Sequence, residues 1–80
     1  MQLICRFDTI DWPEWKAAFD EGAEDRAQHS IQLLQVWRDA DSPSAAVALF
    51  EVHDRAKAEA WIRKETGFGA ALRADFLKTA

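Results

Sequence analysis

Hydrophobic and polar residues alternate along three stretches of the chain, which is the pattern of β-strands because successive strand side chains point to opposite faces of a sheet. The stretches are Gln2–Asp8, Ile31–Asp39 and Ala45–Val52. Between the last two lies a cluster of turn-forming residues, Ala40-Asp41-Ser42-Pro43-Ser44. The pattern therefore predicts one separate strand and, later in the chain, a β-hairpin.

Between the first strand and the hairpin, the apolar residues are spaced as on one face of a helix. This segment follows Asp11 and runs to about Ala27, with Trp15 and Phe19 on the apolar stripe. Asp11 is expected to accept hydrogen bonds from the first free N–H groups of the helix, in a capping box with Glu14. The sequence predicts an amphipathic helix here.

A second helix is predicted from Arg55 to about Thr66, with Asp54 as its N-terminal cap. The tail, residues 74–80, is long enough for a fourth strand, although residues 70–77 could instead extend the helix. Strand–helix–strand–strand–helix–strand order predicts one α+β domain over residues 1–80, with a ferredoxin-like antiparallel sheet and both helices on one face.

The strands are apolar on both faces, although helices on one side can cover one face alone. The face expected toward the helices carries Leu3, Cys5, Phe7, Ala46, Ala48, Phe50 and Val52. If Asp39 pairs with Ala45 across the hairpin, Leu34 and Val36 join that set. The opposite face then carries Ile4, Arg6, Leu33, Gln35, Trp37, Val47, Leu49 and Glu51. A second copy offering the same face would cover these residues, which predicts a homodimer interface.

The length of the chain also favours a partner, because a core built from 80 residues usually needs a disulfide, a metal or an oligomer for support. The single cysteine cannot form an internal disulfide, and no His and Cys residues have metal-ligand spacing. The net charge of −4 argues against nucleic acid or an anionic membrane as partner. No long apolar stretch or signal-peptide pattern occurs, so a cytoplasmic protein is expected.

Several motifs combine into a family resemblance. Trp15-Lys16 and Phe19-Asp20 lie in the first predicted helix, and Trp37-Arg38-Asp39-Ala40-Asp41-Ser42-Pro43 spans the hairpin turn. Leu49-Phe50-Glu51-Val52-His53-Asp54 leads into an alanine-rich helix. Through these features most of residues 1–62 resembles the dimeric α+β barrel superfamily, specifically the antibiotic-biosynthesis monooxygenases and the uncharacterised cyclase-like small proteins near them.

The resemblance implies a homodimer whose two sheets form a barrel, with a pocket between sheet and helices in each subunit. Members of the superfamily include cofactor-free oxygenases, haem-degrading enzymes, isomerases and proteins without a known activity. The fold therefore does not select a function.

Six residues are candidates for binding an apolar or aromatic small molecule: Arg6, Trp15, Phe19, Trp37, Phe50 and Trp61. The aromatic members could equally form the core and the dimer face. Arg6 and Glu51 could pair within or across subunits, to orient a polar substrate or to set dimer specificity.

His53 is the candidate catalytic residue, as a general base or an axial haem ligand oriented by Asp54, although an exposed histidine at a strand end is the simpler interpretation. His29 suits the negative end of the first helix. Cys5 is expected to be a small core residue. No metal or cofactor is predicted.

The predicted pocket contains no acid, base or charged anchor unless His53 or Arg26 reaches into it. Three functions therefore stay open: a dimer that binds an apolar or aromatic small molecule or acts as an accessory protein, a monooxygenase-like enzyme (or haem-binding relative) using His53, and a structural dimer with a filled core. Space between helices and sheet distinguishes the first two from the third.

Overall fold

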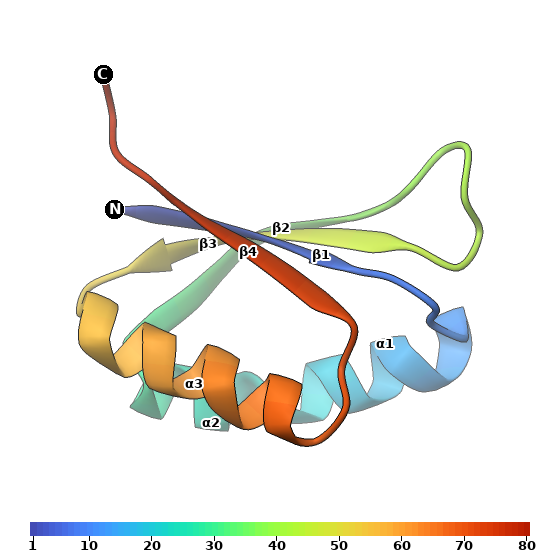
Figure 1. Ribbon diagram of the computed structural model, residues 1–80, viewed down its shortest axis with the longest axis horizontal. Helices are drawn as coiled ribbons and strands as arrows, with labels where there is room; N and C mark the ends of the chain where they lie inside the picture. Colours follow the sequence, from blue (N-terminus) through green and yellow to red (C-terminus); the bar gives the residue numbers. More distant parts are fainter.

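The alternating stretches of the sequence form a four-stranded antiparallel sheet. The computed structural model describes residues Met1–Ala80. The strands are β1 (Gln2–Phe7), β2 (Ile31–Arg38), β3 (Ala46–Val52) and β4 (Leu72–Leu77), in the spatial order β2-β3-β1-β4. Helices α1 (Trp12–Glu21), α2 (Ala23–Gln28) and α3 (Arg55–Gly67) cover one face of the sheet (Figure 1). The predicted α+β class is confirmed, and the strand order is compatible with a ferredoxin-like fold.

The tail of the chain forms a strand and does not extend the preceding helix. After α3, Gly69 adopts a positive φ of 93°, a conformation that suits glycine because it has no Cβ. The chain then returns along β1, with Ala74 opposite Cys5 and Phe76 opposite Leu3. The fourth strand predicted for residues 74–80 is thus present over Leu72–Leu77.

The first helix differs from its prediction in two respects. It is divided at Gly22 into α1 and α2, and so is not continuous to Ala27. The predicted capping box at Asp11 is wrong, because the Asp11 side chain accepts no hydrogen bond and only its carbonyl bonds the N–H of Trp15. The cap predicted for α3 is present, since Oδ1 of Asp54 accepts a bond from the N–H of Lys57 at 3.1 Å.

The core lies between the sheet and the helices. Twelve hydrophobic residues are buried, and they include every residue of β1 and β3 that was predicted to face the helices. Phe50 and Leu3 are the largest side chains that are wholly enclosed. Burial raises the pKa of the Cys5 thiol to about 12, with a smaller contribution from the charge of Asp75, so the thiol is a core group and not a nucleophile at neutral pH.

The hairpin closes as predicted but contains a bulge. The N–H of Asp39 donates to the carbonyl of Ala45 at 3.0 Å. Farther from the turn the register shifts. Leu33 pairs with Phe50, whereas Gln35 pairs with the adjacent residue Leu49, so two steps along β2 match one step along β3. Leu34 is therefore an extra residue in the ladder.

The bulge corrects the predicted faces of β2. Leu33 faces the helices, because it lies opposite the buried Phe50, and so it does not belong to the outer face. Leu34 does not join the core and is 49% exposed. Gln35 and Trp37 keep their predicted place on the outer face, opposite Leu49 and Val47. The prediction counted alternate residues back from the hairpin turn, and it failed at the bulge because one extra residue reverses the side chains on the far side of it from the turn.

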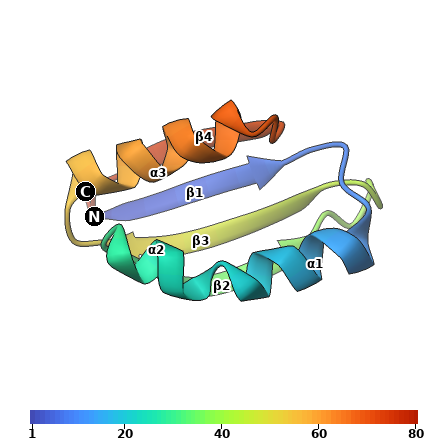
Figure 2. The same cartoon turned by 90° about the horizontal axis from the view of Figure 1, so that it is seen from below.

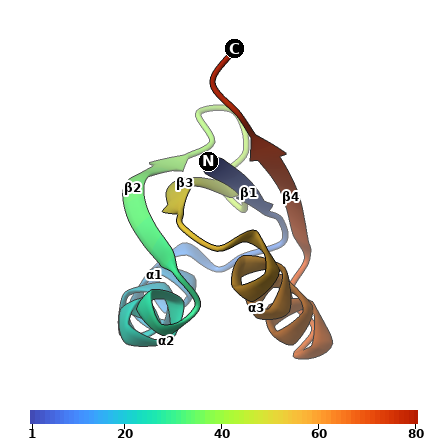
Figure 3. The same ribbon diagram turned by 90° about the vertical axis from the view of Figure 1, so that its left-hand side faces the viewer.

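The helices lie along two separate parts of the sheet. Figures 2 and 3 show α1 and α2 beneath the β2 side and α3 beneath the β4 side, with β1 and β3 visible between them. No helix in the structure has the length and apolar character required to cross a bilayer. The separation of α1 from α3 determines where the candidate site lies.

Ser30 provides a test of the turn into β2. It has φ of 62°, a conformation that costs a residue with a Cβ about 1–2 kcal/mol. We expect Ser30→Gly to raise the free energy of unfolding by roughly 0.5–1 kcal/mol, because the strain removed exceeds the added chain entropy. Ser30→Ala, which keeps the Cβ, is the control. Equal midpoints for the Gly and Ala variants in thermal unfolding would contradict the assignment of strain.

Candidate ligand-binding groove

Aromatic rings form a continuous stack from α1 across to α3. The rings of Trp15 and Phe19 are stacked with centroids 4.8 Å apart, and Phe7 lies 5.0 Å from Trp15. Phe50 continues the series, 6.1 Å from Phe19 and 5.8 Å from Trp61. Trp15 and Phe19 are one turn apart on α1, so both side chains face the sheet, and Trp61 faces it from α3.

Two cavities open along this stack, and together they form a groove between α1 and α3. The first has a volume of about 430 Å³ and lies at the end of β1, near Asp8, Asp11 and Glu14. The second, of about 160 Å³, is bordered by Phe19, Gly22, Arg26, Trp61 and Glu65. The two share Phe7, Trp15, Ala18 and Ala70. We call this the aromatic groove, and the two parts its mouth and its inner end.

Arg26 is a buried cation at the inner end. The residue is 4% exposed, and its guanidinium carbon lies 4.0 Å from the centre of the Phe19 ring. Its Nη1 donates to the carbonyl of Phe19 at 2.7 Å. Gly22 makes room for this position, because a Cβ there would meet Nη1 at 3.0 Å. The break between α1 and α2 thus accommodates the guanidinium.

Most hydrogen-bond donors of Arg26 have no protein acceptor. A guanidinium has five N–H groups, and Arg26 makes one hydrogen bond. None of the chain's ion pairs includes it. No fully buried side-chain nitrogen lacks a partner, so the remaining donors are reached by solvent. Burial lowers the pKa of Arg26, against the opposing charges of Glu65, Asp20 and Asp25, but an arginine stays protonated at neutral pH.

An ion pair joins the two helices beside this arginine. Nζ of Lys64 on α3 lies 2.9 Å from Oδ2 of Asp25 on α2. The bond from Lys64 is the main cause that lowers the pKa of Asp25, followed by smaller effects of His29 and Arg26. Lys64 and Asp25 are sequence neighbours of Glu65 and Arg26, so the bridge fixes the spacing of the inner end.

The structure brings together only part of the predicted ligand site. Trp15, Phe19 and Trp61 line the inner end, and Phe50 lies against Phe19 and Trp61 within the core. Arg6 and Trp37 lie on the opposite face of the sheet. Sequence analysis named Arg26 only as a residue that could reach into the pocket, and the structure places it at the inner end.

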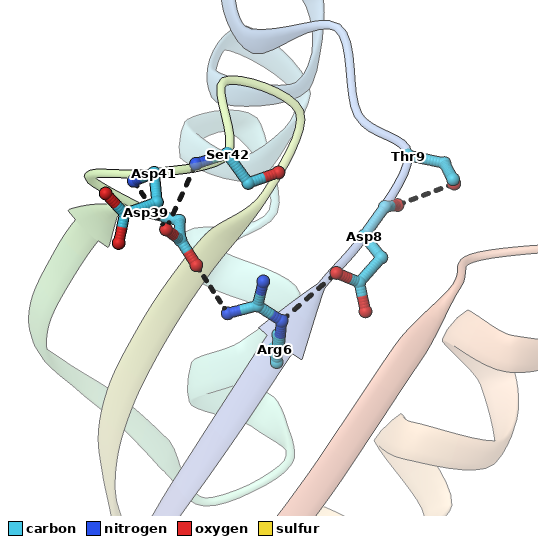
Figure 4. Close-up of polar contacts among 6 residues, drawn as sticks. All are labelled: Arg6, Asp8, Thr9, Asp39, Asp41 and Ser42. Atoms are coloured by element: carbon cyan, nitrogen blue, oxygen red, sulfur yellow. Dashed lines mark hydrogen bonds and ion pairs between the residues drawn. The ribbon is translucent and has the colours of Figure 1, made fainter.

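The pairing predicted between Arg6 and Glu51 does not form within the chain. Arg6 instead lies between Asp8 and Asp39, with nitrogen–oxygen distances of 3.1 and 2.9 Å (Figure 4). The backbone N–H of Asp41 and the Arg6 guanidinium together lower the pKa of Asp39. Glu51 is bonded by Gln2 at 2.6 Å and by the chain's amino terminus.

The histidines have little catalytic support. The side chain of His53 is exposed and forms no hydrogen bond within the chain, and Asp54, its proposed orienting partner, caps α3 instead. His53 does share with Arg26 the border of a separate cavity of about 390 Å³ beside α2. His29 contacts the Asp25 carbonyl at 2.7 Å at the end of α2, in agreement with its predicted place. No group of His, Cys, Asp or Glu side chains is arranged to hold a metal ion.

The outer face of the sheet contains a separate hollow of about 370 Å³. It is bordered by Ile4, Arg6, Val47, Arg73 and Asp75. The register places Arg73 opposite Arg6 and Asp75 opposite Ile4, so β4 adds two charged residues to a face that sequence analysis assigned to β1, β2 and β3 alone.

Comparison of the chain with protein-family models, with curated proteins and with solved structures finds no match. The resemblance to dimeric α+β barrel proteins therefore stays a prediction from the sequence. The functional argument depends on the geometry of the groove and of the sheet.

The Asp25–Lys64 bridge predicts a pH dependence of stability. A carboxyl whose pKa is lowered on folding contributes stability that is present above its unfolded pKa, about 3.9, and is lost as pH falls through the lower folded value. We expect a double-mutant cycle with Asp25→Asn and Lys64→Met to give a coupling of at most about 1 kcal/mol at neutral pH, because the pair is solvent-exposed. The coupling should disappear in strong acid. A coupling that is unchanged between these conditions would show that the charge of Asp25 has no part in it.

Proposed function

We propose that this protein is a homodimer that binds an apolar or aromatic small molecule in the aromatic groove of each subunit. The observation that carries the proposal is an open groove walled by aromatic rings in contact with one another, with the partly buried Trp15 bordering both of its parts. Concave sites of roughly 300–1,000 Å³ with mainly apolar walls are the usual form of small-molecule sites. The mouth alone lies in this range.

The chemistry of the wall favours a flat ligand. Trp15 is stacked on Phe19 and borders both cavities, so a planar molecule in the groove can pack against its ring, and such aromatic pairs contribute about 0.5–1.5 kcal/mol beyond area burial. Ala18 is a small residue shared by both cavities, and it leaves space above the rings. A groove filled by the protein's own side chains would support the structural-dimer alternative, whereas this one has room for a ligand.

A homodimer is supported by the outer face of the sheet. Trp37 is 46% exposed there, beside the partly buried Val47 and Leu49. The hairpin loop and the C-terminal residues both project on this side, beyond opposite ends of the sheet (Figures 1 and 3). A second sheet could therefore pack on the outer face between the hairpin loop and the C-terminal residues.

The charges of this face are suited to a second copy of the chain. Arg73 and Asp75 lie on the same side of β4, and neither forms an ion pair within the chain. A two-fold axis brings a face against itself, so a surface carrying both signs can supply its own counter-charges. A homodimer is also the assembly implied by the resemblance to dimeric α+β barrel proteins.

A monooxygenase-like or haem-binding function has less support from the geometry. His53 has neither an orienting carboxylate nor contact with the aromatic groove. Binding requires only a groove of suitable size and chemistry, so the geometry supports it better than a reaction that depends on His53.

Binding in the groove is testable with 2-naphthol as a flat probe and the tryptophan indole N–H signals as reporters. We expect the probe to shift the signals of Trp15 and Trp61 and to leave that of Trp37 unchanged, with assignments from Trp→Phe variants. Ala18→Leu narrows the groove and should weaken binding about tenfold, equal to about 1.4 kcal/mol. Ala17→Leu, an exposed neighbour outside both cavities, is the control. Shifts confined to Trp37, or no shift at millimolar probe, would refute the site.

The dimer is testable by sedimentation velocity. Trp37→Glu places a charge in the proposed interface, so we expect the variant to sediment as a folded monomer while the unaltered protein sediments as a dimer. Phe68→Glu is the matched control, because Phe68 is 80% exposed and follows α3 away from the outer face. A stable monomer for the unaltered chain at micromolar concentration would rule out the sheet-to-sheet dimer.

A further inference from the structure

The charges along the aromatic groove are unequally distributed. Asp8, Asp11 and Glu14 lie at the mouth, whereas Arg26 lies at the inner end. Asp8 shares Arg6 with Asp39, and Asp11 and Glu14 have no ion-pair partner. The groove therefore becomes more positive inward, and an anionic group that enters is drawn away from the mouth.

Arg26 borders the inner end of the groove. Its Nη1 contacts the Phe19 carbonyl and lies over Gly22, and both residues border the inner end. The guanidinium is stacked on the Phe19 ring, which is itself part of the aromatic wall. A flat molecule packed against Trp15 would thus bring its leading edge toward the guanidinium of Arg26.

We infer that the aromatic groove selects planar aromatic molecules that carry a carboxylate or a similar single anionic group, and that Arg26 binds that group. The inference rests on the proposed ligand-binding function and specifies its ligand class. Arginine fits this role because its planar fork matches the geometry of a carboxylate and forms strong charge-assisted hydrogen bonds.

Glu65 lies on α3, across the groove from α1, and its negative charge would repel the anionic group of the ligand. It borders the inner end on α3, and its charge is the largest one that opposes the lowering of the Arg26 pKa. No ion pair joins the two residues. A bound carboxylate therefore gains from Arg26 and is repelled by Glu65, so removal of the Glu65 charge should strengthen the binding of anions alone.

Arg26 also has a structural role that the test must separate from binding. Its bond to the Phe19 carbonyl satisfies one of the last acceptors of α1, and its packing on Phe19 supports the core. A variant of Arg26 can therefore lose stability as well as affinity. A comparison of two ligands on the unaltered protein avoids this difficulty.

The experiment compares naphthalene-2-carboxylate with naphthalene-2-carboxamide, which has the same rings without the charge, by titration of the Trp15 and Trp61 indole signals. The unaltered protein should bind the carboxylate about tenfold more tightly. Glu65→Gln should increase this preference, and Arg26→Met, confirmed as folded by its amide spectrum, should abolish it while amide binding persists. Arg26→Lys, which keeps the charge and loses the fork, should retain part of the preference.

Equal affinity of the unaltered protein for the two compounds would overturn the role of Arg26 and leave the groove as a site for neutral aromatics. A failure of both compounds to shift Trp15 and Trp61 would overturn the proposed function, and with it this inference. A carboxylate preference that persists in Arg26→Met would assign the anion to another residue and would equally refute the inference.

Discussion

The contact between the Arg26 guanidinium and the Phe19 ring connects the main parts of this molecule. It occupies the space that Gly22 leaves at the junction of α1 and α2, and it bonds a carbonyl near the end of α1. The same ring belongs to the stack that links α1 through Phe50 to Trp61 on α3. Helix geometry, core packing and the charge of the groove therefore depend on one cation–π contact, which is stronger when it is shielded from water.

The architecture could be predicted from the sequence because its signals are local. Alternation predicted the faces of β1 and β3, and helical spacing predicted that Trp15 and Phe19 share the apolar stripe of the first helix. Asp54 acts as predicted because a cap depends on the next three residues. The cap at Asp11 was wrong, because the backbone carbonyl alone sufficed to start α1.

Features that depend on tertiary geometry were not predictable. The bulge at Leu34 has no sequence marker, and it moved Leu33 from the predicted interface to the helix side. Arg6 pairs with Asp8 and Asp39 in place of Glu51, because the fold brings Asp39, at the start of the hairpin turn, close to β1. Arg26 was named only as a residue that could reach into the pocket, because its burial against Phe19 and beside Gly22 depends on how the helices pack.

The bulge at Leu34 has a consequence for the solution behaviour of the sheet. β2 is an edge strand, and a regular edge exposes a row of free N–H and carbonyl groups to which any extended chain can add. An extra residue interrupts that row and twists the strand, so foreign strands find no continuous template. Growth of the sheet along its hydrogen-bonding direction is thereby hindered at the β2 edge.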